Sequence, residues 1–442
     1  MRSLATSNRA AVRAMSGAIA RLSSRSRAHE FLRILHRMGA DPAEIVPTVR
    51  DSPNFRNRRF EADEPSLRPR LRAQTSALLA AIRVHGRGRP VGEVPRMRPV
   101  LPEQAGELAV TWYGHATTLL ELDGARLLID PVFGDRVSPS NRFGPKRLHP
   151  VPGRIEEIPS VDVVLVSHDH YDHLDAPSIT ALERTHQPHY VVPLGVNFHL
   201  MAWGVPKDRI TSLDWRESTQ VADVRLTCTE ARHNSGRGLV DSQTLWAGWA
   251  IHGPRHSAYY SGDSGTSKRF ARIGADLGPF DLTLLPIGAY DPYWPDLHLE
   301  PEQAVAAHRD VNRIGAVTEA VTADETGVAD EFIEGDQRID TPVGAHEEGE
   351  LTPTEREAWT AAATSVMLPV HWATFNLAMH WWAEPMRRVR RAAEEAGVPL
   401  ISPRLGERVD LTEAEADVVA AKYAQPWWEE CSAAEDSGYR DV

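Results

Sequence analysis

The chain has 442 residues, of which 42% are hydrophobic, and a formal net charge of −12. This acidic balance argues against general nucleic-acid binding, which needs a basic surface, and the sequence has no run of eighteen apolar residues that would predict a membrane-spanning helix. Two cysteines are too few for a disulfide framework or a cysteine-based zinc site, so we expect a cytoplasmic protein.

Residues 1–100 are predicted to be a basic, mostly helical N-terminal extension. Residues 1–40 hold eight arginines and one acid, Glu30. As a basic amphipathic helix, this arm could lie on anionic lipid, peripheral to the inner face of the membrane. The ordinary behaviour of a charge run is a solvated helix or a disordered segment. Both interpretations stay open, and the start lacks the clean apolar region of a secretory signal.

From Leu108 onward, short apolar and β-branched runs bounded by turn residues predict strands. The continuous run 161–167 is typical of a strand that is buried on both faces. Strands are predicted at 108–112, 117–122, 126–130, 161–167, 189–193, 225–230, 244–251, 258–261, 282–286 and 366–370, and helices at 176–186, 300–310 and 385–396. Helices between groups of strands favour sheets covered by helices, an α/β or α+β architecture.

Residues 316–365 interrupt this rhythm and are predicted to be an acidic insertion within a hydrolase domain that spans 101–425. The stretch from Glu319 to Arg356 holds twelve acids and two bases. A long segment of this kind in a compact domain is either functional, for example a lid, or disordered. Residues 426–442 are expected to form a polar C-terminal tail.

The segment SHDHYDHLD directly follows the predicted strand 161–167 and holds four potential metal ligands within six residues. They are His168, His170, Asp172 and His173. Imidazole and carboxylate together suit Zn²⁺, with Fe or Mn as alternatives. A lone pair of histidines would be an ordinary polar loop, but this concentration of donors at a strand end predicts a site for two metal ions.

Further ligands must then come from distant parts of the chain. His233 in TEARHNSG, Asp263 in YYSGDSG and His371 in LPVHWATF each sit at or just after a predicted strand. Gly262 and Gly265 flank the aspartate, and their freedom would let the backbone bring its carboxylate close to a metal.

The order HxHxDH, His, Asp, His resembles the metallo-β-lactamase superfamily. Further segments, among them VTWYGHATTLLELDG, YYSGDSGTSKRF and PVHWATF, resemble N-acylphosphatidylethanolamine-hydrolysing phospholipase D and its bacterial relatives. The resemblance covers residues 51–61 and 108–410. It implies a four-layer αββα sandwich with the metals at one edge, and it offers a homodimer as a candidate assembly.

The resemblance also implies a role for individual residues. His168, His170 and His233 would hold the first zinc, Asp172, His173 and His371 the second, with Asp263 bridging both. Asp130 would support the site from behind, where carboxylates orient ligand imidazoles. His115 and Tyr171 are candidates for supporting the site or contacting substrate, and His298 matches a histidine near the substrate pocket.

The sequence therefore predicts a zinc-dependent phosphodiesterase of phospholipase D type, with a phospholipid or another small molecule as substrate and two Zn²⁺ per chain. Hydroxide held by the metals would attack phosphorus, and Asp172 would also hold the water, with His298 as a second catalytic candidate. Two alternatives stay open: a lactonase or other small-molecule hydrolase on the same fold, and a non-catalytic, metal-stabilised protein that binds a membrane or a partner.

Overall fold

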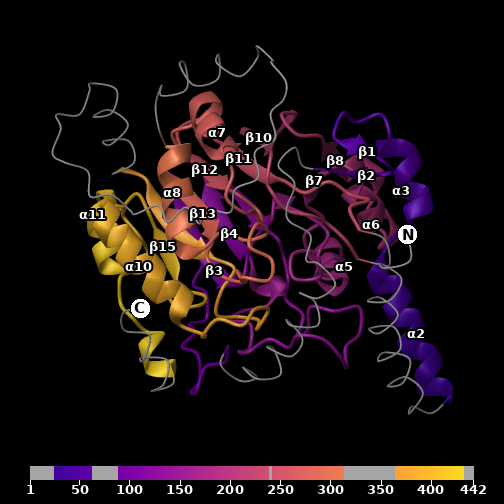
Figure 1. Cartoon of the computed structure of the whole chain (residues 1–442), viewed down its shortest axis with the longest axis horizontal. Coiled ribbons are helices and arrows are strands. Elements are labelled where there is room, and N and C mark those ends of the chain that lie inside the picture. The colour runs from indigo at the N-terminus through magenta and orange to yellow at the C-terminus, as the bar shows by residue number, and fades with distance from the viewer. Residues whose placement is uncertain (1–23, 62–87, 238–240, 313–363, 433–442) are drawn as a thin grey trace, which may run out of the picture.

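The computed structural model describes residues 24–61, 88–237, 241–312 and 364–432. The predicted acidic insertion lies outside these residues except for its last two positions. Among the described helices, none is long and apolar enough to cross a membrane. The described chain forms two mixed sheets with helices on either side (Figure 1), so the predicted layered α/β fold is confirmed.

The first sheet has seven strands in the order β15-β3-β4-β5-β6-β7-β8. Neighbours from β15 to β5 run antiparallel, and those from β5 to β8 run parallel. The strands are β3 (Leu108–Gly114), β4 (Thr117–Leu122), β5 (Ala125–Ile129), β6 (Val163–Leu165), β7 (His189–Pro193), β8 (Ile210–Leu213) and β15 (Arg408–Asp410).

The second sheet has six strands in the order β14-β13-β12-β11-β10-β9. Its first half is parallel, from β14 to β12, and the rest is antiparallel. The strands are β9 (Ser218–Val221), β10 (Val224–Thr229), β11 (Gly248–His252), β12 (Ser257–Tyr260), β13 (Leu282–Pro286) and β14 (Val366–Val370).

Helices cover the outer faces of the two sheets (Figure 1). α5 (Ala176–Thr185) and α6 (Val196–Ala202) pack on the first sheet, and α7 (Arg269–Leu277), α8 (Pro301–Val311) and α10 (Glu384–Ala396) pack on the second. The remaining described elements are α2 (Ser24–Met38), α3 (Pro42–Val49), the hairpin of β1 (Phe55–Arg56) and β2 (Arg59–Phe60), α11 (Ala416–Lys422), and three short 3-10 helices, η1 (Ile155–Glu157), η2 (Lys207–Arg209) and η3 (Glu429–Cys431).

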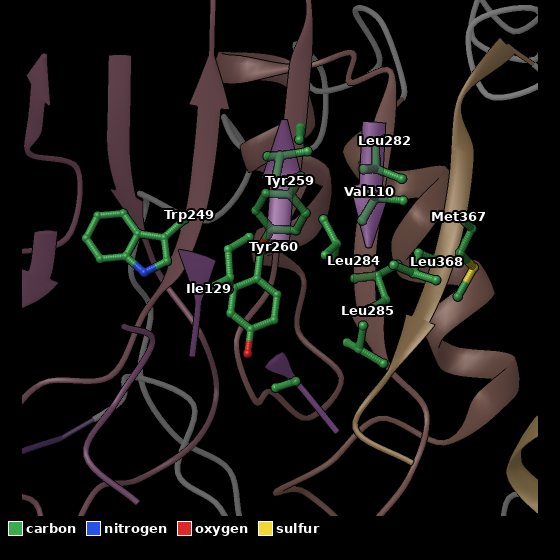
Figure 2. Packing of buried hydrophobic residues seen from close by; sticks show 14 of the residues in the cluster. Val110, Ile129, Trp249, Tyr259, Tyr260, Leu282, Leu284, Leu285, Met367 and Leu368 are labelled. Carbon is green, nitrogen blue, oxygen red and sulfur yellow. The ribbon is translucent and has the colours of Figure 1, made fainter. Parts of the chain in front are cut away.

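The main core lies between the sheets. Because successive side chains of a strand point to opposite faces, Val163 and Leu165 of β6 join this core while Val164 packs with α5 and α6. Figure 2 shows Ile129 of the first sheet close to Tyr260 of the second. Every residue of β6 is buried on one face or the other, which explains its continuous apolar sequence.

The strand predicted at 244–251 and the N-terminal extension both differ from the structure. The strand predicted at 244–251 begins only at Gly248, because the backbone N–H groups of Leu245 and Ala247 donate to Leu194 and Ser167 instead of to a strand ladder. The N-terminal extension is helical in α2 and α3, but it then forms the β1–β2 hairpin, and residues 88–107 contain no helix.

The segment expected to be a polar tail, 426–442, is described only over 426–432, where its apolar side chains pack into the core; the rest lies outside the described residues. Trp427 and Trp428 are buried, and Trp427 stacks on Trp372 with 5.4 Å between ring centroids. Trp372 stacks in turn on Trp112 of β3. The aromatic cluster therefore joins the end of the described chain to the residue that follows His371.

Replacing Trp427 with alanine should lower the free energy of unfolding by about 3–5 kcal/mol, because a large ring would leave a cavity. Chemical denaturation followed by circular dichroism measures the loss. Val418→Ala, at an exposed position on α11, is the matched control and should shift stability by less than about 0.5 kcal/mol. Equal stability of both variants would show that residues 426–432 do not belong to the core.

Candidate metal centre

Candidate ligands from both sheets meet at one edge of the sandwich. The loop 168–173 follows β6, Asp263 follows β12, and His371 follows β14 directly. Parallel strands present their carboxyl ends at the same edge of a sheet, so the topology brings these distant residues together. His233, beyond β10, reaches the same place.

The backbone of this edge adopts unusual conformations. His115, Asp130 and His371 have φ values of 54°, 40° and 63°, a region that costs a residue with a side chain on the order of 1–3 kcal/mol. Gly262 has a φ of 60°, and a Cβ there would lie 2.3 Å from the carbonyl oxygen of Ala247. Glycine before Asp263 is therefore required by a close backbone approach as well as by its φ.

The first cluster consists of His168, His170 and His233. His170 Nδ1 lies 2.8 Å from His168 Nε2 and 3.3 Å from His233 Nε2. His233 Nδ1 faces the carbonyl of Leu297 at 2.9 Å, so that nitrogen carries the proton and Nε2 offers its lone pair. Three imidazole nitrogens thus converge on one point.

The second cluster consists of His173, His371, Asp172 and His115. His371 Nε2 lies 3.1 Å from His173 Nε2 and 3.4 Å from the Oδ2 of Asp172. His115 Nε2 lies 3.0 Å from the same Asp172 oxygen. The backbone also ties the two halves together, because His371 N–H donates to the carbonyl of His115.

Asp263 lies between the clusters. Its Oδ2 is 3.0 and 3.1 Å from the Nε2 atoms of His173 and His371. The same oxygen is 3.9 and 3.7 Å from the Nε2 atoms of His168 and His233. One carboxylate thus faces both groups of imidazoles, which is the geometry of a bridging ligand.

Asp130 holds the site from behind. Its carboxylate accepts hydrogen bonds from the backbone N–H and the hydroxyl of Ser167, from Nδ1 of His173 and from the hydroxyl of Tyr260. Because Nδ1 of His173 is engaged in this way, its Nε2 must face the clusters, and its tautomer and ring orientation are fixed.

The buried charges divide the imidazoles into two kinds. Burial lowers the pKa of His168 and of His233 well below the ordinary value, so both are neutral. Burial acts in the same direction on His371, but the carboxylates of Asp263 and Asp172 outweigh it and raise its pKa to about 9.

This donor set fits a pair of metal ions. Neutral imidazoles with free lone pairs and ionised carboxylates are the forms in which these residues bind metal. Oδ1 of Asp263 and Nδ1 of His371 are buried and lack a hydrogen-bond partner among the described residues. The clusters are therefore consistent with a binuclear site of imidazole and carboxylate ligands.

A cavity of about 330 Å³ opens onto both clusters. His170, Asp172, His233, Asp263 and His298 form its polar floor, and its walls include Val137, Trp294, Leu297 and Leu377. The loop 290–300, dense in aromatic residues and proline, thus shapes the cavity.

The structure brings together all seven predicted ligands, and it also places the predicted supporting residues. His298 lies at the cavity with Nδ1 3.8 Å from Oδ2 of Asp263, and burial lowers its pKa to about 4. Tyr171 lines the cavity and donates its hydroxyl to the carbonyl of Arg237.

Sequence reasoning missed a buried arginine that supports the ligand loop. The guanidinium of Arg237 donates to the carbonyls of Asp169 and Leu174, at either end of the loop, and to that of Arg37. It also lies 4.1 Å over the ring of Tyr171. Each backbone partner lies at least 63 residues from Arg237, so no local sequence pattern marks the contact, although the nearness of Arg237 to His233 is a usable hint.

Asp130→Asn should lower metal affinity by about 10–100-fold, because the amide cannot replace the charge that fixes His173. Competition against a chromophoric chelator measures the affinity of the purified protein for Zn²⁺. Tyr260→Phe removes one donor but keeps the carboxylate, and it should stay within a few-fold of the wild type. If Asp130→Asn binds zinc as tightly as the wild type, this carboxylate does not support the site.

Known proteins share these features. A beta-lactamase superfamily domain matches residues 125–319. An uncharacterized protein of Mycobacterium tuberculosis is 42% identical over 408 residues, which cover 90% of this chain and 94% of that protein. The N-acyl-phosphatidylethanolamine-hydrolyzing phospholipase D 1 of Caenorhabditis elegans is 40% identical over 214 residues, 46% of this chain and 60% of that protein.

Among solved structures, the metallo-beta-lactamase fold protein YhfI of Bacillus subtilis is 13% identical, and the match covers 69% of this chain and 100% of that one with a TM-score of 0.40. The sequence matches, the two-sheet fold and the paired clusters lead to one conclusion: the chain belongs to the metallo-β-lactamase superfamily and is a metal-dependent hydrolase of that fold.

Proposed function

We propose that this protein is a zinc-dependent phosphodiesterase of phospholipase D type that cleaves N-acyl phosphatidylethanolamine-like lipids. The observation that carries the proposal is the position of Asp263 between two imidazole clusters at the floor of a cavity with apolar walls. The similarity to the worm phospholipase over 214 residues supports this substrate class over others on the fold.

The first cluster, His168, His170 and His233, would hold one zinc ion. His173, His371 and Asp172 would hold the other, and Asp263 would contact both. When bound, the two cations would acidify water and offset negative charge that develops on phosphate oxygens.

Asp172 and His298 would serve the reaction from two sides of the cavity. Burial raises the pKa of the Asp172 carboxyl, but His173 and His115 outweigh burial and hold this pKa well below its usual range. The carboxylate is therefore ionised and can accept a hydrogen bond from the attacking water. His298 is neutral, and a neutral imidazole can donate its N–H to a substrate oxygen or to the leaving alkoxide.

The cavity walls match the two parts of such a substrate. The residues that line the cavity, all of them described, include no lysine or arginine. A phosphate bound there would therefore depend on the metal ions for its neutralisation. The side chains of Val137, Leu297 and Leu377 offer an apolar surface to the glyceride portion.

The purified protein should release the N-acyl ethanolamine from an N-acyl phosphatidylethanolamine in detergent micelles. Mass spectrometry of the products with and without chelator checks both the bond that is cleaved and the need for metal. Chelation should abolish turnover, and added zinc should restore it. Faster turnover of a lactone panel would instead favour the lactonase alternative, and no hydrolysis by a fully zinc-loaded protein would favour the non-catalytic one.

Asp172→Ala should lower kcat on the same substrate by at least about 100-fold, because it removes both a metal ligand and the acceptor that orients water. Zinc content per chain must be measured alongside the rate. Asp214→Asn, at a buried carboxylate that accepts hydrogen bonds from Ser52 and Asn54 and does not line the cavity, controls for loss of a buried acid. Unchanged turnover and zinc content in Asp172→Ala would remove Asp172 from the mechanism.

A further inference from the structure

Over residues 30–38, α2 buries two charged side chains and exposes three large apolar ones. Its buried face carries Glu30 and Arg37 beside Ile34, whereas Phe31, Leu32 and Leu35 are 54%, 62% and 46% exposed. A helix at the surface of a globular protein ordinarily buries its apolar stripe and exposes its charges. Three large apolar side chains within five residues mark a surface built to be covered.

The loop of residues 136–147, together with the segment up to 154, is cationic. From 136 to 155 the sequence has no acidic residue but five basic ones, although the whole chain carries a net charge of −12. Arg142, Phe143 and Lys146 are exposed at the tip of this loop. An aromatic ring between two cations suits the boundary between lipid headgroups and acyl chains.

The helix and the loop form one surface. The hydroxyl of Ser140 donates to Glu30 over 2.6 Å, and the guanidinium of Arg37 donates to the carbonyl of Ser138. Glu30, the single acid of α2, is buried in this contact and pairs with Arg33 and with Arg142 of the loop, at 3.3 and 3.9 Å. Among the residues of this surface whose burial is described, those that remain exposed carry no negative charge.

This surface borders the cavity of the metal centre. Val137 and Pro145 belong to the same loop and line the cavity. Tyr171, from the ligand loop, packs with Val137 and Phe375 in a small apolar cluster of its own. A ligand that covers the helix and the loop would therefore lie beside the entrance to the site.

We infer that α2 and residues 136–147 form a docking surface for an anionic lipid bilayer, and that the bilayer presents the substrate to the adjacent cavity. The inference deepens the proposed function and rests on it for the identity of the substrate. The charge of the surface favours a bilayer over a second copy of this chain, because two cationic surfaces repel each other. In a bilayer, anionic headgroups would face the cations and the acyl region would cover Phe31, Leu32 and Leu35.

The test uses the full chain and vesicles that contain no N-acyl lipid, so that binding is measured without turnover. Co-sedimentation should show binding to phosphatidylcholine mixed with phosphatidylglycerol, and binding weaker by on the order of tenfold to phosphatidylcholine alone. Raising the salt concentration should weaken binding, because exposed charges are screened. Equal binding to both vesicle types without salt dependence, or no binding to either, overturns the proposal.

Variants locate the surface. Leu32→Ser combined with Leu35→Ser should lower binding to anionic vesicles by at least about tenfold. Removal of two cations by Arg142→Gln and Lys146→Gln should weaken it by on the order of fivefold for each charge. Val418→Ser, an equally exposed apolar position on α11, is the matched control and should bind as the wild type does, and thermal melting verifies that each variant is folded.

Two further measurements separate the possible failures. Sedimentation velocity compares the oligomeric state of the wild type with that of the variant carrying both Leu32→Ser and Leu35→Ser. A dimeric wild type and a monomeric variant would show that the surface is an interface between copies of this chain instead. Turnover of substrate in detergent micelles should be unchanged in the same variant. If the wild type hydrolyses micellar substrate but does not bind vesicles, the docking surface is wrong and the proposed function stands. If it binds vesicles but does not hydrolyse the substrate, the docking surface stands and the proposed function is wrong.

Discussion

The arrangement of the site depends on one buried carboxylate that joins the two sheets. Asp130 follows β5 of the first sheet, and Tyr260, which donates to it, ends β12 of the second. An isolated buried charge would be strongly destabilising, but Ser167 and His173 supply further donors. Because the same carboxylate fixes His173 and bridges the sheets, the packing of the sandwich sets the position of the ligand loop.

The features that sequence could predict are local or periodic ones. His168, His170, Asp172 and His173 stand within six residues, so the short chain between them keeps all four near one edge of the fold. The β-branched run that becomes β6 predicts a buried strand, because a parallel strand covered on both faces is apolar along its whole length. His233, Asp263 and His371 were predicted through their places at strand ends and through the family resemblance, and the sheet topology brings all three to the same edge.

The features that sequence could not predict depend on contacts between distant segments. Ser167 and Tyr260 belong to no motif. Ser167 reaches Asp130 because β5 and β6 are parallel neighbours in one sheet, and Tyr260 reaches it through the packing of the second sheet on the first. Arg237 gains its role from carbonyls that lie far apart in sequence. The tryptophans at 427 and 428 lie in a stretch of polar composition, and their burial follows from an aromatic cluster assembled from β3, the turn after β14 and the C-terminal segment.

The separation of charge between the site and its border has a physical reason. The carboxylates of Asp172 and Asp263 are needed to hold cations, so the floor of the cavity cannot itself attract an anionic surface. Salt screens exposed charges beyond about 8–10 Å, so the overall charge of −12 matters less to a bilayer than the charges that touch it. The loop tip beside the cavity carries arginine, lysine and phenylalanine, and it would let this acidic protein approach an anionic membrane. The carboxylates at the floor of the cavity would still hold two cations within reach of a phosphate.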